Sequence, residues 1–117
     1  MTDRSAVAAL SAQQFQILLA LVDEDRHGYG IIRDVAERTD GVIRLGTGPL
    51  YTAIARLVTL GWLAETDRRD ADDARLRYYR LTASGRRALE VETARLDALV
   101  TAARRKGIRL RPTRGRA

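Results

Sequence analysis

Residues 46–61 constrain the fold most strongly, because this stretch marks both ends of one short helix. Pro49 suits the first helical position, where its missing N–H and fixed φ cost nothing, and Gly48 can cap the helix in front of it. Gly61 can end the helix in the left-handed conformation that a C-terminal cap favours. Between these ends apolar residues recur with helical spacing and predict one core-facing stripe: Leu50, Ile54, Leu57 and Val58.

The opposite face of this helix contains no acidic residue. It carries small side chains and a few hydrogen-bond donors: Tyr51, Thr52, Ala55, Arg56 and Thr59. A helix that enters a DNA major groove needs small side chains for close approach and donors for phosphates and base edges. A half-buried packing helix explains the same face equally well, so this helix alone leaves both interpretations open.

An earlier helix is predicted by the capping box of Ser11 and Gln14, and we expect it to run to Glu24. Its main apolar stripe is expected at Phe15, Leu18, Leu19 and Val22. Ile17 and Leu21 widen the apolar surface beyond one face. A second contact surface, formed with another molecule, would explain that width.

A second helix is expected to follow His27-Gly28-Tyr29-Gly30 and to run to Arg38. Its buried side is predicted at Ile31, Ile32, Val35 and Ala36. A turn at residues 39–41 and a short extended piece at 42–45 then lead into the helix of residues 49–61. Two helices, a brief connection and a third helix with a specialised outer face make a helix-turn-helix arrangement.

Residues 62–66 and 75–81 are expected to form two strands, joined by the charged segment 67–74. A hairpin with a long charged tip, directly after a helix-turn-helix, is typical of the wing of a winged helix. The segment is a solvated loop in any case, and its basic side chains can also straddle a phosphate backbone or enter a minor groove. These side chains are Arg68, Arg69, Arg75 and Arg77.

Thr82 predicts the start of a last and longest helix, residues 83–105. Its apolar residues follow a nearly heptad spacing: Leu89, Leu96, Leu99, Val100 and Ala103. So long a helix has little core of its own left to cover, and we expect it to pack against a second subunit in a two-fold dimer. The predicted fold is mainly α with a small β-hairpin: a winged helix-turn-helix domain (1–82), a dimerisation helix (83–105) and a basic, disordered tail (106–117).

The net charge of +6 resides in the tail, because seven of the 21 basic residues lie from Arg104 onward, where there is no acid. The rest of the chain has 14 basic and 15 acidic residues. Such a tail can clamp phosphates without sequence preference or can simply keep the chain in solution, and the sequence favours neither. With no cysteine and no run of about 20 apolar residues, we expect a cytoplasmic bacterial protein without disulfides or membrane spans.

An enzyme is poorly supported. His27 is the only histidine, and beside a glycine turn it fits a structural or exposed residue better than a general base. No Gly-rich phosphate loop follows a strand. The acidic pairs Asp72-Asp73 and Glu90/Glu92 lie in a loop and on opposite sides of a helix, so neither forms a catalytic dyad. We expect no catalytic residue, no metal site and no cofactor.

Several short motifs follow one another with a characteristic order and spacing over residues 10–103. They are His27-Gly28-Tyr29-Gly30, Gly48-x-Leu50-Tyr51, Arg56-Leu57, Leu60-Gly61-Trp62-Leu63 and Tyr78-Tyr79-x-Leu81-Thr82-x-x-Gly85. Any one of these is weak, but together they are specific. In these features the chain resembles the PadR-type bacterial transcriptional regulators, in the short form with a single C-terminal helix.

The resemblance implies a winged helix-turn-helix dimer that binds a pseudo-palindromic operator, usually as a repressor released by a small molecule. It also implies that the third helix enters the major groove and that Tyr51, near its start, contacts DNA. Dimerisation through the first and last helices is implied as well.

Two positions depart from the family. Pro49 stands where these proteins commonly have threonine, so one hydroxyl donor is absent. Some multidrug-responsive members stack ligands on a tryptophan of the last helix, whereas the only tryptophan here, Trp62, lies in the first wing strand. That mode of drug binding is therefore not expected.

From these inferences we predict two sets of site residues. The DNA-binding set is Thr47, Gly48, Tyr51, Thr52, Arg56, Arg68, Arg69, Arg75 and Arg77. The dimerisation set is Phe15, Leu18, Leu19, Val22, Leu89, Leu96, Leu99, Val100 and Ala103, with any small-molecule effector expected at the dimer interface. The alternative is a winged-helix adaptor that contacts only proteins, which would favour apolar or acidic groups on the third helix.

Overall fold

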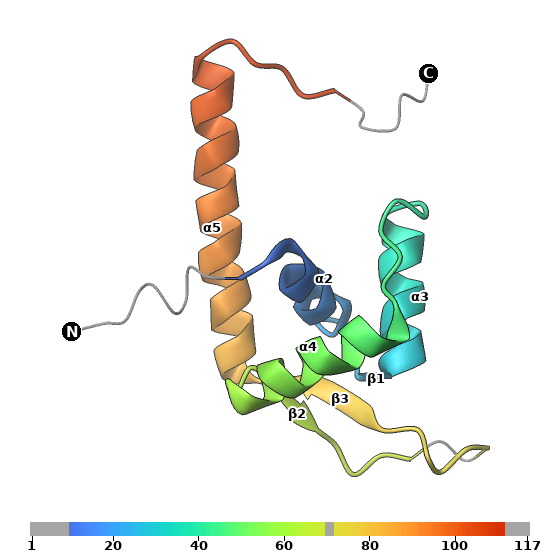
Figure 1. Ribbon diagram of the computed structural model, residues 1–117. Helices are drawn as coiled ribbons and strands as arrows, with labels where there is room; N and C mark the ends of the chain where they lie inside the picture. The colour runs from blue at the N-terminus through green and yellow to red at the C-terminus, as the bar shows by residue number, and fades with distance from the viewer. Residues whose placement is uncertain (1–9, 70–71, 112–117) are drawn as a thin grey trace.

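The computed structural model describes residues 10–69 and 72–111 (Figure 1). In chain order its elements are α2 (Ala12–Ala20), β1 (Arg26–His27), α3 (Gly28–Arg38), α4 (Thr47–Thr59), β2 (Leu63–Glu65), β3 (Tyr78–Leu81) and α5 (Ala83–Arg105). The expected fold, a winged helix-turn-helix followed by a long C-terminal helix, is confirmed. No helix in these ranges combines the length and the apolar character that crossing a membrane requires.

The sheet has three antiparallel strands in the order β1-β3-β2, one more than the predicted hairpin. β3 is central: Tyr79 lies opposite both Arg26 of β1 and Glu65 of β2. The strand that the sequence analysis missed, β1, is only two residues long and lies between the first two expected helices. So short a strand has no alternation to detect, and it is recognisable only by its pairing with β3.

The core lies where α2, α3 and α4 meet above the sheet. Its fully buried side chains include Ile17 and Leu18 of α2, Ile31 and Val35 of α3, and Leu50 and Leu57 of α4. The expected stripe of α2 was partly wrong: Ile17 and Leu21 are buried, whereas Leu19 is half-buried and Val22 is exposed.

α2 also ends at Ala20 rather than Glu24. The Arg26 Nε–H donates a hydrogen bond of 2.8 Å to the Ala20 carbonyl oxygen, and this satisfies one of the last unpaired carbonyls of the helix. The acidic residues that follow, Asp23, Glu24 and Asp25, are disfavoured in the last turn because they repel the negative end of the helix dipole.

α4 begins two residues before the predicted start. Gly46 is its N-cap, so Pro49 occupies the third helical position, where a backbone N–H would still have no partner inside the helix. Gly61 follows the helix with φ +81°, as predicted for a C-terminal cap. Val58 is 39% exposed instead of joining the buried stripe, because it lies about 80° around the helix from Leu50.

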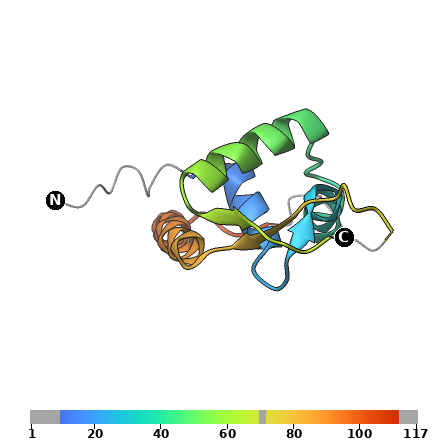
Figure 2. The same cartoon turned by 90° about the horizontal axis from the view of Figure 1, so that it is seen from below.

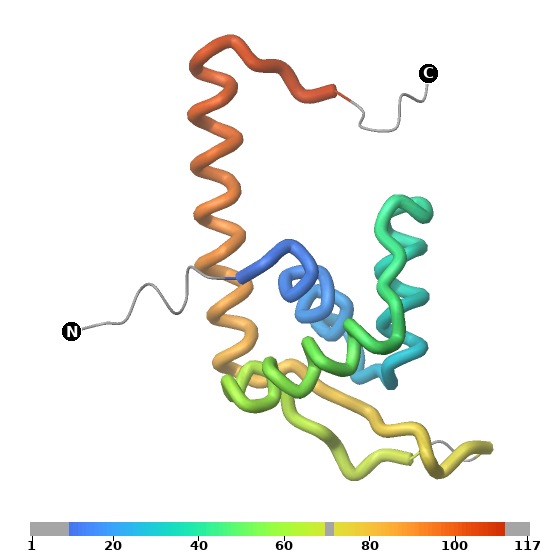
Figure 3. Tube along the Cα trace, viewed as in Figure 1, coloured from blue at the N-terminus to red at the C-terminus, as the bar shows by residue number. Residues whose placement is uncertain are grey.

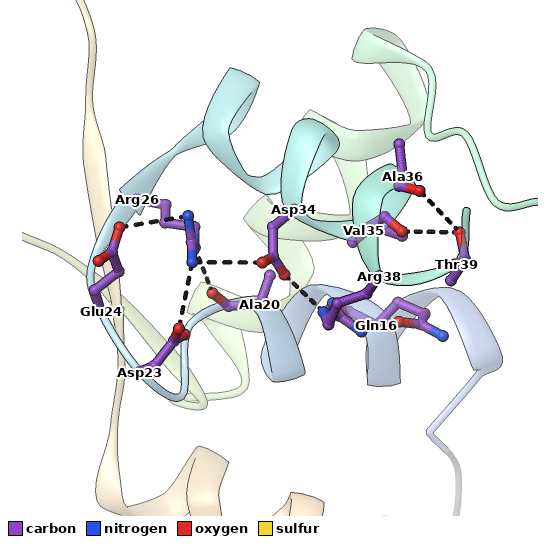
Figure 4. A network of polar contacts seen from close by, with 10 residues as sticks. All are labelled: Gln16, Ala20, Asp23, Glu24, Arg26, Asp34, Val35, Ala36, Arg38 and Thr39. Carbon is purple, nitrogen blue, oxygen red and sulfur yellow. Dashed lines mark hydrogen bonds and ion pairs between the residues drawn. The ribbon is translucent and has the colours of Figure 1, made fainter. Parts of the chain in front are cut away.

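Two arginines hold α3 against α2 through one shared carboxylate (Figure 4). Asp34 lies 3.4 Å from Arg26 and 2.8 Å from Arg38, and its side chain is only 17% exposed. Arg26 reaches the C-terminal end of α2 as described, and Arg38 donates to the side-chain oxygen of Gln16 at 2.8 Å. Asp34 thereby connects β1 and α3 with the middle and the C-terminal end of α2.

α5 starts at the N-cap Thr82, whose hydroxyl accepts from the Gly85 N–H at 3.0 Å. A side chain at residue 85 would overlap the carbonyl oxygen of Trp62, so the helix can approach the wing this closely only with glycine there. The first turns of α5 contact α2, and the later turns extend away from the other elements (Figure 3). Residues 106–111 follow without helix or strand, and residues 112–117 of the predicted tail lie outside the described residues.

We predict that Asp34→Asn lowers the free energy of unfolding by about 1–2 kcal/mol, because two partly buried guanidinium groups lose a charged acceptor. Asp23→Asn is the matched control: it also removes a carboxylate beside Arg26, but the Asp23 side chain is 72% exposed. That variant should change the free energy by less than about 0.5 kcal/mol. Urea unfolding of both variants measures the difference, and equal effects would contradict the role of Asp34.

Candidate nucleic-acid interface

α4 presents an exposed face without acidic residues along one edge of the molecule (Figure 2). Its side chains are Tyr51, Thr52, Ala55, Arg56 and Thr59. Within the described part of the chain, the Arg56 guanidinium forms no hydrogen bond or ion pair. The positive charge of Arg56, the one basic residue of α4, is therefore not paired with a carboxylate among the described residues.

The first turn of α4 is open as well. The N-cap Gly46 makes no side-chain capping bond, so the N–H groups of Thr47 and Gly48 remain accessible at the positive end of the helix dipole. A Cβ on Gly48 would meet nothing within 4 Å, so the fold itself does not require glycine at this position. Packing within the chain thus gives no reason for glycine at residue 48. A bound molecule that comes close to the backbone there would give one, because glycine has no side chain in its way.

An open hollow of about 490 Å³ separates the N-terminal part of α4 from the wing. It is lined by Tyr29, Tyr51, Asp73, Arg75, Leu76, Arg77 and Tyr79. Three phenol groups and two guanidinium groups therefore face one space. All of them can donate hydrogen bonds to an anion such as a phosphate.

Tyr51 is placed in this hollow by its contact with Gly28, at the start of α3. A Cβ at residue 28 would overlap the Tyr51 hydroxyl, so glycine there lets the phenol ring lie against the backbone. Burial, and then the neighbouring Tyr29, raise the pKa of Tyr51. A phenol is protonated at neutral pH already at the ordinary pKa of 10.0, so the Tyr51 hydroxyl can act as a donor.

Two predicted wing arginines face the hollow, and each is paired with a carboxylate. Arg77, directly before β3, donates to Glu65 of β2 at 2.6 Å. Arg75 binds both oxygens of Asp73 at 3.0 and 3.2 Å. The hydrogen bonds from Arg75 lower the pKa of Asp73, which therefore stays charged. The wing is consequently less positive than its arginines alone would make it.

Arg68 lies on the opposite face of the sheet and does not join this group. Its guanidinium lies 4.1 Å above the ring of Tyr78, while His27 contacts the same ring edge-on at 5.1 Å between centroids. His27 itself caps α3, since its Nδ1 accepts the Gly30 N–H at 3.0 Å. This histidine has the structural role that its position beside a glycine turn predicted.

The expected dimerisation residues divide into three groups: buried, half-buried (Phe15, Leu19 and Ala103) and exposed. Leu18 and Leu89 lie in the core of the single chain and leave almost no surface for a partner, so we remove them from the set. Leu96, Leu99, Val100 and Val22 are exposed, Leu99 by 55%. Beside them a groove of about 480 Å³ runs between α2 and α5, lined in part by Leu19, Val22 and Leu89.

Sequence reasoning missed five residues of the hollow and its rim: Tyr29, Asp73, Leu76, Tyr79 and Glu65. Tyr29 is 54% exposed, and its place two residues after the only histidine gave no sign of its orientation. Asp73 was treated as part of the charged tip. Glu65 was assigned to the first wing strand, and alternation along a strand predicts that a residue facing Tyr79 shares its side of the sheet. Over residues 10–69 and 72–111, no group of histidine and acidic side chains could hold a metal ion.

Comparison with known proteins places these features in a family. Residues 17–91 match the family model described as the transcriptional regulator PadR-like family. No match was found among curated proteins.

Solved structures share the fold. A transcriptional regulator from Clostridium thermocellum matches with a TM-score of 0.68 and 22% identity, over 92% of this chain and 100% of that one. A PadR family transcription regulator from Clostridium difficile matches with a TM-score of 0.64 and 23% identity, over 78% of this chain and 95% of that one. BpsR of Bordetella bronchiseptica matches with a TM-score of 0.62 and 24% identity, over 93% of this chain and 72% of that one. The DNA binding of BpsR is regulated by 6-hydroxynicotinic acid.

The raised pKa of Tyr51 predicts a loss of stability in alkali. The folded state keeps the phenol neutral above the ordinary tyrosine pKa of 10.0, whereas the unfolded chain loses that proton first. The stabilising contribution is therefore complete below pH 10 and is lost as the pH rises through the folded value. Urea unfolding between pH 8 and 11 should show a shallower alkaline decline for Tyr51→Phe than for the wild type. Identical declines would contradict the partial burial of this phenol against Gly28.

Proposed function

The chain belongs to the PadR-like family of transcriptional regulators, and from that membership we propose that it is a dimeric repressor that binds an inverted-repeat DNA operator. The observation that carries the proposal is the exposed face of α4, which has no acid and presents Arg56 without a carboxylate partner among the described residues. A helix face of this kind suits the major groove, where small side chains permit close approach and an arginine can bind guanine through two hydrogen bonds.

In the proposed complex, phosphates are held at the start of α4 and sequence is read further along it. Thr47, Tyr51 and Thr52 supply hydroxyl donors, and the backbone at Gly48 allows the phosphate to come close. Arg56, one turn further along, reaches the base edges. Arg75 and Arg77 of the wing, which line the hollow, contact the sugar-phosphate backbone of the DNA.

The dimer is proposed to form through α2 and the later turns of α5. These turns carry exposed apolar side chains that contact little else in the described chain: Leu96, Leu99 and Val100. Phe15, Leu19, Val22 and Ala103 complete the proposed surface. A two-fold axis there would place the two α4 helices about one DNA turn apart, ~34 Å.

The small-molecule effector is proposed to bind the groove between α2 and α5, next to this dimer surface. An effector can release DNA only if it binds better to a dimer geometry in which the spacing of the recognition helices is wrong. Regulation of DNA binding by a small molecule, 6-hydroxynicotinic acid, occurs in BpsR, a protein of similar fold.

The test is a titration of the purified protein against genomic fragments, including its own upstream region, with competitor DNA and at several salt concentrations. Protection of a short inverted repeat by protein with the mass of a dimer is the expected result. Binding that competitor abolishes equally on every fragment would exclude an operator, and the adaptor interpretation would then take its place.

We predict that Arg56→Ala costs about 1–3 kcal/mol in operator binding and relaxes the preference at one base pair of each half-site. Arg87→Ala on α5 is the matched control, since it removes the same charge from an exposed helix position outside the proposed interface. Competition with operators mutated one base pair at a time measures the preference. An unchanged preference in Arg56→Ala would remove this residue from base recognition.

A further inference from the structure

Glu65, at the end of β2, is the carboxylate that faces two of the wing arginines, Arg69 and Arg77. Its Oε2 accepts the bond from Arg77 at 2.6 Å and lies 3.7 Å from Arg69. β2 and β3 pair so that Glu65 lies opposite Tyr79, a residue that lines the hollow beside α4. The carboxylate therefore lies on the side of the sheet that faces α4 and holds two of the cations proposed to bind DNA.

We propose that Glu65 is a positioning residue for DNA binding: it competes with DNA phosphate for Arg69 and Arg77, so that the wing binds phosphate only where α4 is docked. The proposal rests on the proposed function, because it assumes that α4 enters DNA. In this proposal Glu65 weakens the binding of DNA, whereas the hydrogen-bond donors around it strengthen it.

The distances explain why the competition depends on docking. Coulomb attraction falls with separation, so a carboxylate at hydrogen-bond distance outcompetes a phosphate that lies several ångströms further away. A protein held loosely on a non-specific sequence leaves its phosphates at such distances. Once α4 is seated in the groove, the phosphates beside the hollow come within hydrogen-bond reach, and the exposed ion pair, which contributes little by itself, can be exchanged.

The exchange has a thermodynamic signature in salt. Each phosphate that the protein neutralises steepens the dependence of log K on log [salt] by about 0.9. In the wild type, Arg69 and Arg77 should contribute to this slope on the operator but not on a non-specific duplex. Removal of the Glu65 charge frees both arginines on either DNA.

The experiment compares Glu65→Gln with the wild type by fluorescence anisotropy, on a 20-base-pair duplex of scrambled sequence and on the operator identified by footprinting, across a salt series. We expect Glu65→Gln to bind the scrambled duplex several-fold more tightly, with a slope steeper by about one to two. On the operator, binding should tighten without a change in slope. Glu37→Gln on α3 is the control, because it makes the same change in net charge at an exposed position on another element.

The other outcomes would overturn the proposal. Equal behaviour of Glu65→Gln and Glu37→Gln would mean that the carboxylate does not compete. Weaker binding by Glu65→Gln would mean that it orients the arginines productively, and a slope that changes on both duplexes or on neither would remove the dependence on docking. If the wild type shows no operator, the proposed function fails, while the scrambled duplex still decides whether Glu65 competes.

In the double variant Glu65→Gln/Arg77→Ala the gain on the scrambled duplex should be clearly smaller, because one of the two freed guanidinium groups is then absent. Thermal unfolding of the same proteins verifies that they are folded. A gain that persists in full without Arg77 would also overturn the proposal, since the effect would then arise from net charge alone.

Discussion

The hydroxyl of Thr82 joins the part of the molecule that is proposed to bind DNA to the helix that is proposed to bind a second subunit. It donates to the Gly61 carbonyl at the end of α4, at 2.6 Å, and accepts from Gly85 in the first turn of α5. The backbone N–H of the same residue donates to Trp62 at 3.1 Å. The ends of α4 and β3 and the start of α5 therefore meet at one residue. Because Gly85 also permits the closest approach of α5 to the wing, the angle between α4 and α5 is set within a few residues of Thr82.

Local signals predicted the elements well wherever an end is determined by its own residues. Ser11 and Gln14 form the capping box, Thr82 caps α5, and Gly61 adopts positive φ. Errors occurred where a distant residue decides. α2 stops at Ala20 because Arg26, six residues further on, binds its last carbonyl, and β1 exists only because β3 lies beside it. The order and spacing of the family motifs carried the functional prediction, since no single face or charge in this chain is specific enough.

The candidate interface was harder to predict than the fold because the sequence shows which charges exist but not which of them meet. Arg68 and Arg77 look alike in a charged hairpin, yet Arg68 lies against Tyr78 on one face of the sheet and Arg77 binds Glu65 on the other. Period-two alternation could have placed Arg75, Arg77 and Tyr79 on a common face once the strand was known. It could not have placed Arg68, whose segment has no regular structure.

The same uncertainty affects the proposed dimer surface. Leu89 was expected to face a partner but lies in the core against α2, whereas Leu96 and Leu99, two and three turns further along the same helix, are exposed. α5 thus belongs to the domain in its first turns and is available to a partner in its later ones. A helix of 23 residues transmits a rotation at one end to the other because its backbone hydrogen bonds resist bending. A ligand in the groove between α2 and α5, as proposed, would contact the first half of α5, and a change in the angle of this helix would alter the spacing of the two α4 helices in the proposed dimer.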